Sequence, residues 1–488
     1  MIIFGGIKIK NKLLIKSKIL AILILFFGMT FISVINGQNI NKISYEKYSK
    51  NNFFKTDDTY DFLIICPKYF ARLVKPLVNH KEKHGIKTYL ATLREIYSNE
   101  NSQLGRDKPE KIKLFIKDAF ENWGIKYVLL IGGKISQTKK WHLPVRYIHL
   151  GNGWESKIIS DLYFADIYDS QGEFCSWDSD EDGKFGEWFY GEQPQDKFID
   201  FYPDVSIGRL PCQNRFEVRL VVRRIINYEN KYQKDEPWFN NMIVAAGDTY
   251  PEKNNPAWVG NEGEFYGDRA IENMTGFNPI KLYTSDGSLT HWKDILKPMN
   301  NGSGFIYFVG HGCPMLWTNN YPNATGGRVE PFGVFQIARL RNKNKLPVCV
   351  VSGCHNLQFD VRIFNYFNKT KRAHAEYVPE CWGWQMTRKI GGGSIATIGC
   401  TALGHTKEDK PISFVGGINE LEVEFFKQYG QNKIEIIGNT WANAIKWYID
   451  IYPVNWNSEL TNESWVDEQV VSTWILFGDP TLKIGGYP

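Results

Sequence analysis

Cysteine is scarce in this sequence, with only eight residues among 488, and no two of them form a CxxC pair. So few cysteines argue against a disulfide framework, and the missing CxxC spacing argues against a structural zinc site. Cys66 and Cys349 lie inside apolar runs, where we expect inert core residues. With disulfide and zinc roles disfavoured, any chemical role of the other cysteines depends on the residues near each of them.

Long apolar runs are almost absent as well. The longest, residues 19–35, has 17 residues, follows a lysine-rich stretch and lies in a segment, 1–37, that contains no acidic residue. This pattern predicts a secretory signal over 1–37, with an uncleaved N-terminal membrane anchor as the alternative. The polar residues 38–57 are then a linker or pro-segment, and we expect the remainder to be secreted.

Excess charge is also missing once segment 1–37 is set aside. The formal net charge is +5, and the five lysines of that segment account for all of it. A neutral remainder gives no electrostatic reason to expect nucleic acid as a partner. A membrane is expected as a partner only through an uncleaved first segment.

Strand–helix alternation fills the rest of the chain, which is 43% hydrophobic. Short apolar runs separated by amphipathic stretches predict an α/β fold with mostly parallel sheets. The length suits two domains, and the charged stretch before Pro237 marks a boundary, so we predict subdomains at 58–234 and 235–488. The expected strands are 60–66, 86–91, 127–133, 242–246, 279–283, 305–309, 348–352 and 394–398.

Two of these strands end at chemically reactive side chains. His311 follows the apolar run 305–309, and Cys354 follows 348–352. Because the carboxyl ends of parallel strands meet at one edge of a sheet, we expect the two side chains to lie together. A thiol beside an imidazole is the pair that a cysteine nucleophile needs. The backbone N–H groups of Gly312 and Cys354 are the candidate oxyanion hole.

A rival pair is present in the same two loops. Cys313 lies two residues after His311, and His355 follows Cys354 directly. We rank this pair lower because Cys313 precedes Pro314 and already belongs to the outgoing loop. The alternative for Cys354 and His311 is a buried core thiol and a hydrogen-bonded core histidine without a catalytic role.

Two acidic residues are candidates for supporting roles. Asp248 ends the strand near 242–246, where its carboxylate can orient His311 as the third member of a triad; a local cap is the alternative. Glu264 lies at the start of a predicted helix and can bind a basic substrate side chain. Its alternative is a solvated acid that favours the helix dipole.

An acidic loop predicts a bound calcium ion. Asp178, Asp180 and Asp182 alternate before a glycine, like the first half of a calcium loop, and Glu187 would supply the late ligand. Clustered carboxylates repel one another without a cation, which favours structural Ca²⁺ over a solvated turn. No organic cofactor is expected.

Seven motifs follow one another along about residues 58–484. They are the apolar run 60–65, Ser160–Asp166, the acidic stretch 177–187, 202–211, Gly310-His-Gly312, Ser352-Gly-Cys354 and 476–482. Their order and content resemble the gingipain-like cysteine peptidases, a branch of the caspase-like clan. The resemblance implies two caspase-like three-layer subdomains and an endopeptidase that acts through a covalent thioester.

The same resemblance also implies roles for single residues. His311 and Cys354 take the catalytic positions, and Asp248 falls where the family places an acid near the catalytic histidine. Glu264 falls near the acid at the base of the primary specificity pocket of Arg-cleaving members, and the family binds calcium.

The sequence therefore predicts a secreted cysteine endopeptidase that acts on proteins or peptides, with Arg or Lys preferred before the scissile bond. Two alternatives stay open. One is a non-catalytic surface-binding module on the same fold, and the other is a transpeptidase that uses the same cysteine and histidine.

Overall fold

The protein was analysed as a computed structural model, which describes residues 59–151, 155, 157–189, 192–252, 254, 260–322, 327–406, 416–454 and 462–488. The predicted signal 1–37 and linker 38–57 lie outside the described residues. Within the described part of the chain, no helix combines the length and the apolar character needed to cross a membrane.

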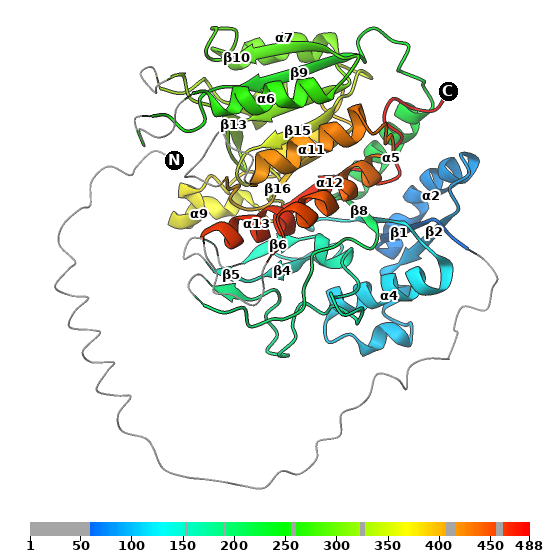
Figure 1. Ribbon diagram of the computed structural model, residues 1–488. Helices are drawn as coiled ribbons and strands as arrows, with labels where there is room; N and C mark the ends of the chain where they lie inside the picture. Colours follow the sequence, from blue (N-terminus) through cyan, green and yellow to red (C-terminus); the bar gives the residue numbers. More distant parts are fainter. Residues whose placement is uncertain are drawn as a thin grey trace, which may run out of the picture. The chain divides into compact units, whose positions relative to one another are not determined.

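One ten-stranded sheet organises the described residues (Figure 1). Its strand order is β10 (Asn278–Tyr283), β9 (Asn241–Ala246), β11 (Phe305–Val309), β15 (Val348–Ser352), β16 (Ala396–Cys400), β17 (Trp474–Phe477), β8 (Ser206–Leu210), β3 (Tyr127–Ile131), β1 (Phe62–Cys66) and β2 (Thr88–Thr92). Neighbouring strands are parallel except β16 and β17, which are antiparallel. The sheet thus consists of two parallel halves that run in opposite directions. The predicted α/β class with mostly parallel strands is confirmed; the subdomain boundary near residue 234 stays a prediction.

The strands form where short apolar runs are buried on both faces. All five residues of β1, β11 and β15 are buried, and these strands are rich in Val, Ile and Phe. Such continuous apolar runs are typical of parallel strands covered by helices on both sides, whereas a half-exposed strand would alternate apolar and polar residues. The composition of each strand therefore fixes its place inside the sheet.

Three helices form a row on one face of the sheet. α6 (Glu262–Asn273) packs beside α11 (Ile418–Gly430), and α11 packs beside α12 (Ile437–Ile451) (Figure 1). α6 contacts β9 and β11, and α11 contacts β15, so this row supports the strands that lead to His311 and Cys354. The remaining α-helices are α2 (Lys68–Lys83), α3 (Leu93–Ile96), α4 (Lys108–Trp123), α5 (Arg215–Glu229), α7 (Trp292–Asn301), α8 (Val334–Ile337), α9 (Lys369–Ala373), α10 (Trp382–Arg388) and α13 (Asn462–Thr473).

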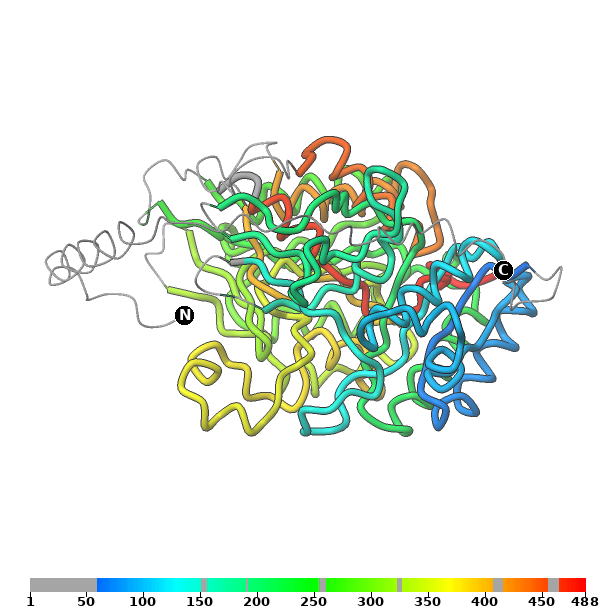
Figure 2. The backbone as a smooth tube through the Cα atoms, turned by 90° about the horizontal axis from the view of Figure 1, so that it is seen from below, coloured from blue at the N-terminus to red at the C-terminus, as the bar shows by residue number. Residues whose placement is uncertain are grey.

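The C-terminal segment packs back into the middle of the sheet. β17 pairs with β16 on one side and β8 on the other, and Figure 2 shows the red segment continuing toward the blue N-terminal strands. Just beyond it, the buried Lys81 ammonium lies 2.9 Å from Asp479 and 2.7 Å from Glu229. Buried charges are tolerated only when paired in this way, so the three side chains hold the tail against α2 and α5.

Candidate active site

Three neighbouring strands deliver the predicted catalytic side chains to one edge of the sheet. β11 pairs with β15 so that Val309 lies opposite Ser352, and it pairs with β9 on its other side. His311, Cys354 and Asp248 each lie two residues beyond the last residue of their strand. The parallel register therefore brings the predicted residues to adjacent positions at the carboxyl ends of the strands.

The loops that carry His311 and Cys354 approach each other at two glycines. A Cβ atom on Gly353 would lie 3.1 Å from the Gly312 Cα and 2.1 Å from the Asn356 side-chain oxygen, so no larger residue fits there. The Asn356 amide donates hydrogen bonds to the carbonyl groups of Cys313, at 2.8 Å, and Leu316, at 3.0 Å. Asn356 thus fastens the loop after β15 to the hairpin of β12 (His311–Cys313) and β13 (Leu316–Thr318).

The shorter of two contacts at His311 Nε2 favours one tautomer. Nε2 lies 2.9 Å from the Thr249 carbonyl oxygen, which can only accept, and 3.4 Å from the Asn320 amide nitrogen, which can only donate, so the closer contact favours a proton on Nε2. The neutral ring then keeps its lone pair on Nδ1. The Asn320 amide also donates to the Thr249 carbonyl, at 3.3 Å, and so helps to hold this acceptor in place. His311 is therefore oriented as a base with one free basic nitrogen.

Burial keeps the His311 ring neutral. The pKa of His311 is lowered from 6.5 to about 4: burial is the largest cause, the nearby Arg328 guanidinium adds to it, and the Thr249 hydrogen bond acts in the opposite direction. Arg328 also donates to the Asn320 side-chain oxygen at 2.9 Å. At neutral pH the imidazole is thus ready to accept a proton.

The Cys354 thiol lies beside the loop that follows β16. The Gly404 N–H donates to its sulfur at 3.4 Å, and the sulfur lies 3.8 Å from the Gly404 carbonyl oxygen. Burial raises the pKa of the Cys354 thiol, and the Gly404 N–H opposes that rise. The resting group is therefore a neutral thiol whose ionised form has one backbone donor waiting for it.

The rival pair is engaged elsewhere. His355 forms a 2.8 Å ion pair with Glu155, which raises the pKa of this histidine although burial acts to lower it. A histidine that holds its proton is a poor base. Cys313 lies in β12 opposite Leu316, and burial raises the pKa of its thiol. This geometry favours His311 over His355 as the proton acceptor.

Asp248 is buried at the predicted edge, with 1% of its surface exposed, and its N–H donates to the Asn320 carbonyl at 3.3 Å. The group that binds His311 Nε2, however, is the carbonyl of the next residue, Thr249. Asp248 also acts on Glu262 at the start of α6: burial raises the pKa of Glu262 to about 7, and the Asp248 charge adds to the rise. Asp248 and Glu262 are thus two buried acids near the carboxyl end of β9.

Glu264 points into the turn after β10. Its carboxylate accepts hydrogen bonds from the Ser285 N–H at 3.0 Å, the Ser285 hydroxyl at 2.5 Å and the Thr284 hydroxyl at 3.3 Å. Only 7% of its surface is exposed. Since a carboxylate has about four lone-pair sites, three of them are used and one remains.

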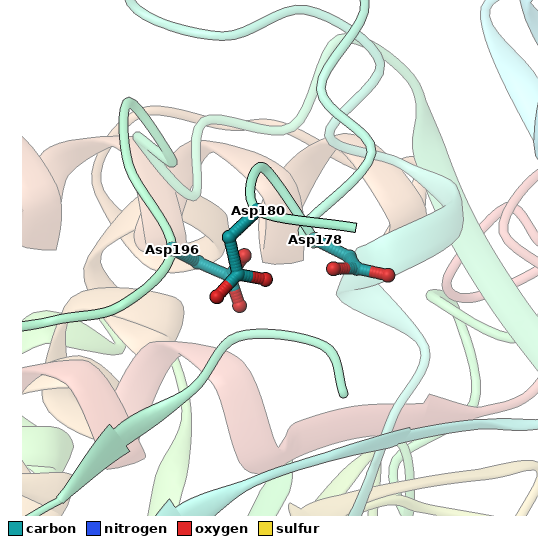
Figure 3. A group of neighbouring side chains, drawn as sticks. All are labelled: Asp178, Asp180 and Asp196. Atoms are coloured by element: carbon teal, nitrogen blue, oxygen red, sulfur yellow. The ribbon is translucent and has the colours of Figure 1, made fainter. Parts of the chain in front are cut away.

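The acidic loop forms a carboxylate cluster, but its residues differ from the predicted calcium ligands. Oxygen atoms of Asp178, Asp180 and Asp196 lie within 4.8 Å of one another, and Figure 3 shows Asp180 and Asp196 meeting with Asp178 beside them. One buried oxygen of Asp178 has no hydrogen-bond partner. Burial raises the pKa of Asp196 to about 7, and Asp178 and Asp180 add to the rise. This donor set, all carboxylate oxygen, fits a calcium ion.

The two other predicted calcium ligands lie against a lysine. Lys184 contacts Asp182 at 2.7 Å and Glu187 at 2.8 Å. This arrangement arises because Lys184 follows Asp182 by two residues and reaches both carboxylates. Asp178 and Asp180 are thus brought together with Asp196, which the sequence analysis did not select.

Several residues of the site carry no signal in the sequence. These residues lie far from their partners in the sequence, and only chain folding brings them together; His311 and Thr249, for example, are 62 residues apart. They are Thr249, Glu155, Gly404 and Asp196. Asn356 alone had a usable signal, because it follows the Cys-His pair directly. The arrangement as a whole combines a thiol, a neutral base and backbone donors, which are the parts required for acyl transfer.

Comparison with known proteins shows the family of the chain. The model of peptidase family C25 matches residues 55–485. Gingipain R2 of Porphyromonas gingivalis strain W83 is 20% identical over 429 residues, which are 86% of this chain and 45% of that protein. Gingipain R1 of Porphyromonas gingivalis is 20% identical over 86% of this chain and 34% of its own length. The chain thus spans less than half the length of these relatives.

Solved structures show the same fold. The crystal structure of the Arg-specific cysteine proteinase gingipain R (RgpB) aligns with a TM-score of 0.58 and 19% identity, over 88% of this chain and 79% of that one. The complex of the Porphyromonas gingivalis RgpB pro- and mature domains aligns with the same TM-score and identity over 87% and 79%.

Proposed function

This chain belongs to peptidase family C25, the gingipain-like cysteine peptidases with a caspase-like fold, and we propose that it hydrolyses peptide bonds with Cys354 as nucleophile and His311 as base. The observation that carries the proposal is the register of β11 and β15, in which His311 and Cys354 follow paired strand ends. The free Nδ1 of His311, left by the Thr249 hydrogen bond, supports it.

The reaction begins with attack of the Cys354 sulfur on the scissile carbonyl carbon. His311 Nδ1 takes the thiol proton as the C–S bond forms, and the carbonyl oxygen becomes an oxyanion held by the N–H groups of Gly312 and Cys354. The C–N bond then breaks, and His311 gives its proton to the leaving amine. Water, deprotonated by His311, hydrolyses the thioester and restores the thiol.

A basic residue before the scissile bond is the proposed substrate preference. The acids at the start of α6 support it, since Glu264 keeps one lone-pair site and lies 7% exposed beside buried Glu262. Fluorogenic peptides that differ only in Arg, Lys or citrulline at this position test the charge. Equal turnover of all three would remove the preference while leaving the peptidase intact.

Calcium and secretion complete the proposal. The cluster of Asp178, Asp180 and Asp196 is the proposed calcium site, and its ion would have a structural role because the cluster lies on the loops between β6 (Ile158–Ser160) and β8. The N-terminal segment 1–37 supports export as a signal, with a membrane anchor as the other form.

The central test is hydrolysis of casein and of fluorogenic peptides by the wild type and by Cys354→Ala. We expect Cys354→Ala to reduce cleavage to background. Cys313→Ala is the matched control, because it removes another thiol near the same edge, and it should retain most activity. Activity that survives Cys354→Ala but disappears in Cys313→Ala would transfer the nucleophile to the rival pair.

A further inference from the structure

An acidic residue from the segment before β6 reaches the loop that carries Cys354. Glu155, three residues before β6, pairs through Oε1 with His355 Nε2 at 2.8 Å. Its other oxygen accepts hydrogen bonds from the Leu403 N–H, at 3.1 Å, and the Gln469 side-chain amide, at 3.2 Å. One carboxylate therefore joins the loop after β15, the loop after β16 and helix α13.

These two loops are the ones that enclose the sulfur. On one side His355 follows Cys354 directly, and its N–H donates to the Ala402 carbonyl at 2.7 Å. On the other side Leu403 precedes Gly404, whose N–H points at the Cys354 sulfur at 3.4 Å. Glu155 thus holds the residues next to the nucleophile and next to its hydrogen-bond donor.

The backbone of His355 needs such support. Its φ angle is +60°, a left-handed conformation that residues other than glycine adopt only at a cost. Backbone strain of this kind persists where surrounding contacts over-determine it. For His355 those contacts are the Ala402 carbonyl and the Glu155 carboxylate.

The pair also sets the charge beside the thiol. The Glu155 carboxylate raises the pKa of Cys354, although burial is the larger cause of that rise. A proton on His355 balances this negative charge. The other titratable or charged groups that act on the pair are His405, Asp360, Glu376 and Cys400.

We propose that Glu155 and His355 form a positioning pair for the nucleophile: together they hold the Cys354 loop in its strained conformation, and the His355 proton neutralises Glu155 so that the thiolate can form. This rests on the proposed function, in which Cys354 attacks the substrate. Neither residue touches the scissile bond. The pair acts through the backbone and through the charge it presents to the sulfur.

The test measures alkylation of Cys354 by iodoacetamide against pH, followed by mass spectrometry of the labelled peptide. In His355→Gln the Glu155 charge is unbalanced, so we expect the midpoint of the alkylation curve to rise by about one pH unit, or roughly tenfold slower labelling near neutrality. Glu155→Gln removes the negative charge, so its midpoint should not rise. The double variant should return the midpoint of His355→Gln to that of the wild type.

Peptide hydrolysis supplies the second readout. Both single variants should lose about tenfold in kcat with little change in KM, because the nucleophile is misplaced while the residues proposed to bind the substrate are unchanged. In the double variant the thiol midpoint recovers but kcat does not. A purely structural pair would lower the melting temperature without moving the alkylation midpoint.

A second histidine–glutamate pair provides the matched control. His80 lies 3.0 Å from Glu229 in a buried site between α2 and α5, and His80→Gln makes the same chemical change there. It should leave both the alkylation midpoint and kcat unchanged. A midpoint for His355→Gln equal to that of the wild type would overturn the proposal. If the wild type cleaves no peptide while His355→Gln still shifts the alkylation midpoint, the proposed function is refuted, whereas the effect of the Glu155–His355 pair on the Cys354 thiol stands.

Discussion

His311 and His355 lie on adjacent loops of one sheet edge, yet they face opposite charges. His311 meets a neutral carbonyl and the Arg328 guanidinium, and its pKa is lowered to about 4. His355 meets the Glu155 carboxylate, and its pKa is raised. Burial acts to lower the pKa of both rings; the neighbouring Arg328 charge adds to this effect at His311, whereas the Glu155 carboxylate opposes it at His355 and the pKa there is raised.

The largest difference between the two rings is expected when each histidine is replaced by glutamine. His311→Gln removes the proton acceptor and should reduce kcat/KM about 100- to 10,000-fold. His355→Gln removes only a positioning group and should cost about tenfold. Steady-state cleavage of one fluorogenic peptide measures both. Equal losses, or a larger loss in His355→Gln, would reverse the assignment of the two rings.

The next prediction concerns the acid side of the pH profile. The pKa of His311 in the enzyme without substrate is about 4 rather than 6.5. We therefore expect kcat/KM to stay high down to about pH 5 and to fall as the pH drops through about 4. A fall centred near 6.5 would show that this ring is not held neutral.

Protonation of His311 should also change the stability of the folded protein. The unfolded chain binds this proton near pH 6.5, whereas the folded chain resists it until about pH 4, so the free energy of unfolding falls as the pH drops across that window. Burial lowers the pKa of His405 to about 4 as well, so His405 adds to the fall in the free energy of unfolding. Tryptophan fluorescence at each pH separates unfolding from protonation of the active site.

A smaller effect is expected from the cation beside His311. Arg328→Gln removes a charge that lowers the pKa of His311, so the acid limb should move upward by a fraction of a pH unit. Added salt should move the wild-type limb in the same direction by screening the exposed guanidinium. Arg219→Gln, an exposed arginine on α5, is the control and should leave the limb unchanged. A limb that moves downward in Arg328→Gln would contradict the sign of this charge effect.

The sequence predicted the strands that reach the site because their burial is complete. The expected runs 305–309 and 348–352 match β11 and β15 to the residue, since apolar runs bounded by small residues have one stable place in a parallel sheet. The positions of His311 and Cys354 at the strand ends follow from that. α13 was missed because its sequence mixes charged residues and valines without a clear helical period.

The partners of the site could not be read from the sequence. The Thr249 carbonyl is backbone and looks the same at every residue, and Glu155 meets His355 only because β6 lies close to α13 and the β16 loop. Asp248 as the third member of a triad stays a prediction; the backbone group that contacts His311 Nε2 in the structure is the carbonyl of the next residue, Thr249. Long-range contacts of this kind depend on the complete sheet, not on local spacing.

The smallest effect on activity is expected at the carboxylate cluster, where the same electrostatic rule acts between like charges. Asp196 has a pKa of about 7 in the folded protein against 3.8 ordinarily, so without a cation the free energy of unfolding falls as the pH rises from about 4 to about 7. Calcium at 1 mM should therefore raise the melting temperature by about 2 °C or more at pH 8 and much less at pH 5.

Two variants of this loop decide which carboxylates bind the ion. Asp196→Asn should abolish the calcium-dependent shift, because it removes one of the three carboxylates of the cluster. Asp182→Asn, in which the lost carboxylate contacts Lys184, should keep the shift. Differential scanning fluorimetry with calcium or EGTA measures both. A shift that survives Asp196→Asn and disappears in Asp182→Asn would return the site to the ligand set expected from sequence spacing, and would mean that the Lys184 side chain moves away when calcium binds.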